Sequence, residues 1–204
     1  MIGDRRGEGM SLWNLADAYS YLGDYKQAIQ FYQQALEIAQ EMGDRHKEAN
    51  YLRRLGLAYF ELEQDKQAIQ CYQRSLVIAQ EIGDSNGEGI ALGNLGNAYR
   101  FQRNYLQGIE YHQQSLTIFR QIGNRLDEGK ALGNLGYSYF SIADYPQAIN
   151  FLEESLAIMQ ELQNSQEEGY VLIHLCKVYC ALGNYEKALE YNQQHLAIVK
   201  AMLQ

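Results

Sequence analysis

The chain has 204 residues, of which 47% are hydrophobic and 21% charged, so it can bury a core and is not expected to be disordered. Its mean hydropathy is −0.41, no apolar run approaches the roughly 18 residues of a membrane span, and its start lacks the apolar stretch of a signal peptide. Seventeen basic against 25 acidic residues give a formal charge of −8, which argues against a nucleic-acid partner. The single proline, Pro146, indicates a chain that is nearly all helix.

A 40-residue repeat runs through the whole sequence. One position of the repeat is always leucine, at Leu15, Leu55, Leu95, Leu135 and Leu175. The position four residues later is always tyrosine, at Tyr19, Tyr59, Tyr99, Tyr139 and Tyr179. We therefore expect five copies, at about 3–42, 43–82, 83–122, 123–162 and 163–204. No linker interrupts them, so the sequence predicts one array over 1–204, and a period of this length is typical of a solenoid.

Each copy contains two helical stripes separated by short breaks. In copy 3, Leu92, Leu95, Gly96 and Tyr99 have the spacing of one helix face. The first helices are predicted at 5–22, 45–62, 85–102, 125–142 and 165–182, and the second at 25–42, 65–82, 105–122, 145–162 and 185–203. The breaks combine a C-cap glycine with an N-cap residue, as in Gly23-Asp24, and force neighbouring helices to run antiparallel. The break at 63–65 has no glycine, so its turn is free to differ.

The pattern resembles a known family. The tetratricopeptide repeat (TPR) has the spacing seen here at Leu12, Leu15, Ala16, Tyr19, Ala28, Tyr32 and Ala35. The 40-residue length and the strings at 91–99 and 131–136 are similar to its long-repeat branch of Leu-Gly-Asn-repeat adaptors and kinesin light chains, although copies 1, 2 and 5 depart from the Leu-Gly-Asn string. The fold expected is all-α, a right-handed α-solenoid of five antiparallel helix pairs (a TPR superhelix).

No set of residues predicts catalysis, a cofactor or a metal site. The histidines His46, His112, His174 and His195 form no metalloprotease motif, and we expect His112 and His195 to be partly solvated on second helices. Cys176 and Cys180 have a spacing that zinc can use, but Cys176 occupies the small core position of Gly56, which favours packing. Cys71 is expected in the core, in the column of Phe31 and Phe151. A glutamate recurs in every copy and so favours a scaffold role, at Glu8, Glu48, Glu88, Glu128 and Glu168.

A strip on the first helices, opposite the leucine–tyrosine stripe, varies from copy to copy and is the predicted binding surface. It is rich in Trp, Tyr, Phe, Arg and Asn, and it carries five basic and two acidic side chains on an acidic chain. Such a field steers an acidic segment toward the strip, which in the resembling family lines a concave groove. The predicted peptide-binding residues are Asn14, Asn94, Asn97, Asn134, Arg53, Arg54, Arg100, Lys177, Trp13 and Tyr137.

The residue types indicate three roles. The basic side chains would clamp carboxylates, and Trp13 and Tyr137 would be apolar anchors. An asparagine amide can pair with a peptide group, and the resembling branch uses asparagine ladders, whose motif Asn94 and Asn134 match. The alternative is that these asparagines are polar surface or bond to their own helix.

The function expected is a non-catalytic, cytoplasmic protein-interaction scaffold that holds an acidic peptide or short helix. Three cysteines, an odd number, form no disulfide framework, and free thiols fit that compartment. The first alternative is a structural array, a piece of a longer one, that associates end to end through uncovered Ile198, Val199, Met202 and Leu203. The second is a peptide-sensing regulatory domain of a larger protein.

Overall fold

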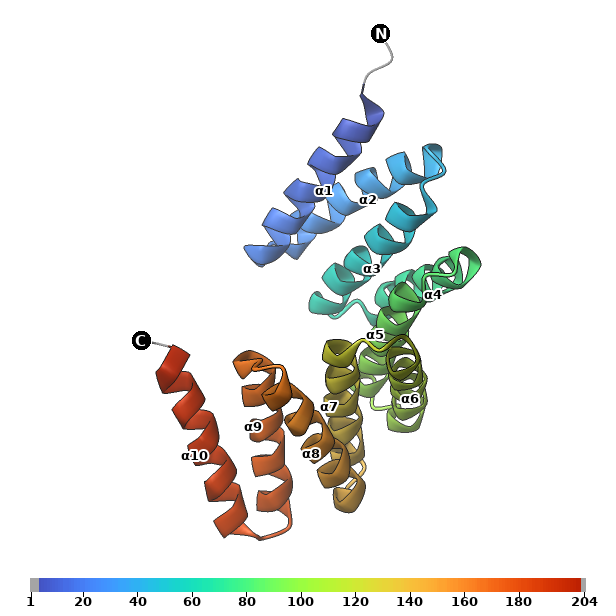
Figure 1. Cartoon of the computed structure of the whole chain (residues 1–204). Helices are drawn as coiled ribbons and strands as arrows, with labels where there is room; N and C mark the ends of the chain where they lie inside the picture. Colours follow the sequence, from blue (N-terminus) through green and yellow to red (C-terminus); the bar gives the residue numbers. More distant parts are fainter. Residues whose placement is uncertain (1–3, 203–204) are drawn as a thin grey trace. The chain divides into compact units, whose positions relative to one another are not determined.

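The computed structural model describes residues 4–202, and this range contains ten α-helices joined by short turns (Figure 1). They are α1 (Arg5–Tyr21), α2 (Tyr25–Glu41), α3 (Arg45–Glu61), α4 (Asp65–Ile82), α5 (Ser85–Phe101), α6 (Tyr105–Ile122), α7 (Arg125–Ser141), α8 (Tyr145–Glu161), α9 (Ser165–Ala181) and α10 (Tyr185–Met202). Every helix end in this range lies within one residue of its prediction. Leu203, predicted as the last helical residue, lies outside the described residues. The predicted all-α solenoid of antiparallel helix pairs is confirmed.

The Cα positions divide the chain into two compact units, Met1–Ala98 (unit 1) and Tyr99–Gln204 (unit 2), with the boundary inside α5. In unit 1, α1 to α4 (blue to green in Figure 1) pack each against the next along the chain. In unit 2, α6 to α10 do the same, and α7 also contacts α9, the first helix of the following pair. The single array over 1–204 stays a prediction. Within 4–202, no helix has the length and apolar content that a membrane crossing requires.

The turns follow the predicted caps. Gly23 has a φ of +76° and Asp24 accepts a hydrogen bond from the backbone N–H of Gln27 at 3.2 Å. The turn at 63–65, one of four in 4–202 with a residue other than glycine at this position, keeps the same left-handed conformation, with Glu63 at a φ of 58°. Gln64 makes no side-chain cap bond. The packing of the two helices therefore imposes the turn conformation, whichever residue occupies the position.

The core lies between the two helices of each pair and between neighbouring pairs. The repeated leucines are almost fully buried at Leu55, Leu95, Leu135 and Leu175, whereas Leu15 of α1 is 46% exposed. Cys71 is buried, as predicted, and Cys176 packs half-buried against the core of unit 2. The repeated leucine is therefore a core residue in copies 2 to 5, whereas in α1 it is partly exposed to solvent.

Aromatic rings stack between the two helices of a pair. The repeated tyrosine stacks on an aromatic residue of the second helix in Tyr19–Phe31, Tyr99–Tyr111, Tyr139–Phe151 and Tyr179–Tyr191, with ring centroids 5.4 to 5.6 Å apart. In copy 2 the second-helix position is Cys71, so Tyr59 has no such partner ring among the described residues.

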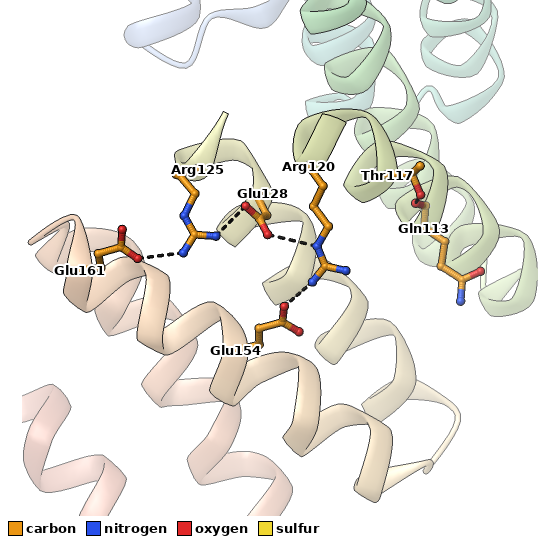
Figure 2. A network of polar contacts seen from close by, with 7 residues as sticks. All are labelled: Gln113, Thr117, Arg120, Arg125, Glu128, Glu154 and Glu161. Atoms are coloured by element: carbon orange, nitrogen blue, oxygen red, sulfur yellow. Dashed lines mark hydrogen bonds and ion pairs between the residues drawn. The ribbon is translucent and has the colours of Figure 1, made fainter. Parts of the chain in front are cut away.

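The recurring glutamate connects helices through ion pairs. Glu128 of α7 is 6% exposed and accepts from Arg125 at 2.8 Å and from Arg120 of α6 at 3.1 Å (Figure 2). The two arginines also pair with α8, Arg125 with Glu161 at 2.8 Å and Arg120 with Glu154. In unit 1, Arg45 pairs in the same way with Glu48 and Glu81. Glu128 and its two arginines thus connect three successive helices, which agrees with a scaffold role for this glutamate.

Candidate functional site

Two predicted arginines lie side by side on α3 in unit 1. Arg53 and Arg54 are half-buried, and neither makes an ion pair with a carboxylate within residues 4–202. Arg53 donates from Nη2 to the side chain of Asn50 at 2.7 Å, and burial, then the charge of Arg54, lowers the pKa of Arg53. The Nε of Arg54 is buried and has no hydrogen-bond partner among the described residues. Positive charge is therefore concentrated here without a direct ion pair, and the internal counter-charge is Asp17, which acts on Arg53 without forming one.

Trp13, the predicted apolar anchor of unit 1, belongs partly to the core. Its ring stacks on Tyr51 with centroids 4.5 Å apart and lies 5.4 Å from the ring of Tyr32. The guanidinium carbon of Arg54 lies 5.9 Å from the centroid of the Trp13 ring. Asp17, one of the two acidic residues of the strip, accepts a hydrogen bond from the hydroxyl of Tyr32. Trp13 thus supports Arg54 as well as presenting part of a ring to solvent.

A pocket of about 260 Å³ adjoins these arginines. It lies between α3 and the first turns of α5, and Arg53, Asn50 and Ile90 line it. Ser75 of α4 also lines it, and its hydroxyl donates to the backbone carbonyl of Ala49 at 2.8 Å. The pocket places the positive charge of Arg53 beside a space large enough for a side chain, and Asp84 also lines it.

Unit 2 contains the equivalent pocket, 80 positions further along the sequence. It has a volume of about 220 Å³ and lies between α7 and α9, with Asn134 and Tyr170 in its lining. Ser155 repeats the role of Ser75 by donating to the carbonyl of Gly129 at 2.7 Å. Lys130 also lines it, but its Nζ lies 3.6 Å from Glu167. This lysine, one of the five basic residues of the strip, is therefore paired with an acidic neighbour.

The predicted asparagines lie on the first helices and present their amides. Asn14 is exposed on α1, Asn94 and Asn97 are half-buried on α5 in unit 1, and Asn134 is half-buried in unit 2. The side-chain amides of Asn14, Asn94 and Asn134 make no hydrogen bond to any other residue of 4–202. These three asparagine side chains thus do not bond to their own helix, which was one of the alternative interpretations.

The remaining predicted residues of unit 2 gather around His174. The guanidinium of Arg100 lies 4.3 Å from the ring centroid of Tyr137, whose other neighbour is the His174 ring at 4.3 Å. Tyr170 contacts His174 edge-on at 4.4 Å. Burial, then Lys177 and Arg100, lowers the pKa of His174 to about 4. Lys177 itself is exposed on α9, with no ion pair among the described residues, so it is accessible to a ligand.

One expectation about the histidines is wrong. His112 is 0% exposed rather than partly solvated. It occupies the column of Tyr32 and Tyr72, which are buried as well. His195 is half-buried, as expected.

The pockets add residues that the sequence did not single out. Glu167 lies outside the varying strip, and Asn50 and Tyr170 belong to the strip but were not selected. A comparison of positions 80 apart would have related the two pockets, but only the packing shows that they are hollow. Among the described residues, no three His, Cys, Asp or Glu side chains are grouped so as to hold a metal ion.

Comparisons with known proteins agree with the fold. The sequence models of the tetratricopeptide repeat match residues 7–81, 87–161 and 171–204. No curated protein matches the sequence.

Solved structures share the fold. BtubC (BKLC) from P. vanneervenii matches with a TM-score of 0.81 and 26% identity, over 92% of this chain and 78% of that one. Putative kinesin light chain TPR-like repeats from Podosopora anserina match with a TM-score of 0.76 and 20% identity, over 100% and 99%. A Rap conjugation gene regulator of the plasmid pLS20, solved with the Phr* peptide, matches with a TM-score of 0.80 and 17% identity, over 94% of this chain and 53% of that one. This chain thus spans about half the length of the Rap regulator. Because the repeat models match most of the sequence, the chain belongs to the tetratricopeptide repeat family.

Proposed function

We propose that this chain is a non-catalytic protein-interaction module whose first-helix surface binds an acidic peptide segment or short helix. The observation that carries the proposal is the pair Arg53 and Arg54, which are half-buried and make no ion pair with a carboxylate among the described residues. A partly desolvated guanidinium binds a carboxylate through two parallel hydrogen bonds, so an acidic side chain is the ligand that satisfies it best. The family and the peptide complex of the Rap regulator support a peptide as the ligand.

The surroundings of the arginines assign roles to the other residues. The adjoining pocket receives one side chain of the ligand, and Trp13 contacts an apolar one. In unit 1 the amides of Asn14, Asn94 and Asn97 pair with the main chain of the ligand, and in unit 2 the amide of Asn134 does so for a segment bound there. In unit 2, Arg100 and Lys177 supply the positive charge and Tyr137 the apolar surface. The proposal places the protein in the cytoplasm, where its three free cysteines stay reduced.

The test is fluorescence anisotropy with two labelled pools of twelve-residue peptides, one with Asp or Glu at alternate positions and one with Asn or Gln there. We expect the acidic pool to bind and the double variant Arg53→Ala/Arg54→Ala to weaken it by more than about tenfold, since each desolvated pair is worth about 2 kcal/mol. Asn94→Ala should weaken binding of the acidic pool without changing its preference over the amide pool, because it removes a main-chain contact and no charge.

The matched control is Lys26→Ala/Lys66→Ala, which removes the same charge from exposed positions on α2 and α4. This control should bind as the unmodified protein does. Equal losses in the two double variants would mean that only net charge matters, and a preference for the amide pool would contradict an acidic ligand.

Self-association is a second candidate, because α1 and α10 expose apolar side chains. Leu15 is 46% exposed and Leu196 is 51% exposed, whereas Leu55 and Leu116, in the same columns, are buried. Leu189 and Met202 of α10 are exposed as well. Surfaces of this kind pack against another helix in repeat arrays.

A further inference from the structure

Copy 2 lacks one aromatic ring that the other four copies have. In those copies the repeated tyrosine stacks on a Phe or Tyr of the second helix, with interplanar angles of 8 to 17°. In copy 2 the partner is Cys71, and no ring among the described residues replaces it. The hydroxyl of Tyr59 still accepts from Gln33 at 2.9 Å, as Tyr139 does from Gln113 at 3.2 Å. The tyrosine is therefore held as in unit 2, while its stacking partner is missing.

The missing ring coincides with a pocket of about 430 Å³ in unit 1. Its floor is apolar and consists of Leu36, Leu55, Tyr59 and Cys71. Burial raises the pKa of the Cys71 thiol to about 11, so this sulfur stays protonated and uncharged at neutral pH. In unit 2 the equivalent position is taken by the Phe151 ring, stacked 5.4 Å from Tyr139. The chain's own repeats thus show which group fits this space.

The rim of the pocket is made of amides. Exposed side chains of Gln67, Gln70 and Gln73 surround the floor, together with Gln33 and the guanidinium of Arg74. Each amide offers a donor and an acceptor, which is the hydrogen-bonding pattern of a peptide group. An apolar floor inside a polar rim is the arrangement that receives one buried anchor residue of a protein partner.

We propose that this pocket, lined by Tyr59 and Cys71, is a docking site for an aromatic side chain, Phe or Tyr, of a partner protein. The ring stacks on Tyr59 in the place that Phe151 takes on Tyr139, and the glutamines bond to the main chain on either side of it. The site uses α2, α3 and α4 and none of the residues assigned to the acidic peptide, so it does not depend on that proposal.

The test uses N-acetyl-phenylalaninamide as the probe and follows the ring protons of Tyr59 by NMR. We expect saturable upfield shifts, because a stacked ring shields its neighbour. N-acetyl-leucinamide, which has the same peptide groups without a ring, should bind at least about threefold more weakly. The same difference is expected for p-cresol, which has the ring without peptide groups.

Two reciprocal variants separate the site from general binding. Cys71→Phe supplies the missing ring, as in copies 1 and 4, and should abolish the shifts at Tyr59. Phe151→Cys opens the equivalent space in unit 2 and should add shifts at Tyr139, which tests the proposal even if the first variant fails to fold. Shifts that persist in Cys71→Phe, or equal binding of the leucine probe, would overturn the aromatic site. Equal or tighter binding of p-cresol would overturn the assignment of a protein partner.

Discussion

At the scale of single residues, His112 lies in an unusual environment for an ionisable side chain. It is fully buried, and neither ring nitrogen has a hydrogen-bond partner among the described residues. Burial, then the charge of Arg100, lowers the pKa of His112 to about 3. An imidazole in an unfolded chain titrates near 6.5. Above that pH the ring is neutral in both the native and the unfolded protein. Below it the unfolded chain binds a proton that the native protein does not, so the free energy of unfolding falls.

We therefore predict that His112→Leu flattens the pH dependence of stability. Leucine suits this column, since Leu152 occupies it in copy 4. As pH falls from about 6.5 toward 3, the unmodified protein should lose about 1 kcal/mol per pH unit through this residue, and the variant should not. Urea unfolding at pH 7.5, 6 and 5 measures the difference. Exposed His46→Gln is the control, and a stability difference that stays constant with pH would contradict the prediction.

At the scale of structural elements, the turns contain the clearest local conflict. Four residues other than glycine adopt a positive φ within 4–202, namely Glu63, Arg103, Ala143 and Gln163. Side chains with a Cβ are disfavoured in this region by about 1 kcal/mol or more. The helix pairs tolerate this cost because the free energy gained by burying apolar surface between the two helices is larger.

Glu63→Gly should raise the free energy of unfolding by about 0.5–1 kcal/mol, since it removes the strain and leaves the buried contacts unchanged. The reverse change, Gly23→Ala, at the equivalent turn of copy 1, should lower it by a similar amount. Urea denaturation of both variants provides the measurement. A loss of stability in Glu63→Gly would show that the glutamate makes a favourable interaction that outweighs its backbone strain.

At the scale of the whole molecule, two features act in opposite directions on association between copies of the chain. The net charge opposes it, and the exposed apolar surface favours it. The formal charge is −8 and the isoelectric point about 5.0, so repulsion between copies weakens as pH falls toward 5. The exposed leucines of α1 and α10 then provide a surface for contact between copies.

Light scattering over a dilution series should therefore show a mass that rises with concentration, more steeply at pH 6 than at pH 8. Leu15→Gln/Leu196→Gln should suppress the rise, because it places a polar amide within each exposed apolar face. Leu106→Gln, at a position 74% exposed on α6, is the matched control and should not. A single monomer mass at every concentration would exclude self-association as a function.

The sequence by itself determined the helices, their ends and most of the core. Periodic leucines and tyrosines, cap residues such as Asp24, and the position of Pro146 act over a few residues, so they are visible without a fold. Because the copies repeat without a slip in register, the helix boundaries assigned in one copy held in the others. The residues of the candidate site could be named for the same reason, from the columns that vary.

Tertiary structure alone decided what those residues contact. His112, Trp13 and Lys130 each have neighbours from other helices, at sequence separations that no local pattern encodes. The pocket at Tyr59 is of the same kind: the sequence shows a cysteine in an aromatic column, but only packing shows that no other side chain fills the space. Burial and pairing depend on which surfaces meet across a repeat, and this is a property of the assembled helices rather than of any one of them.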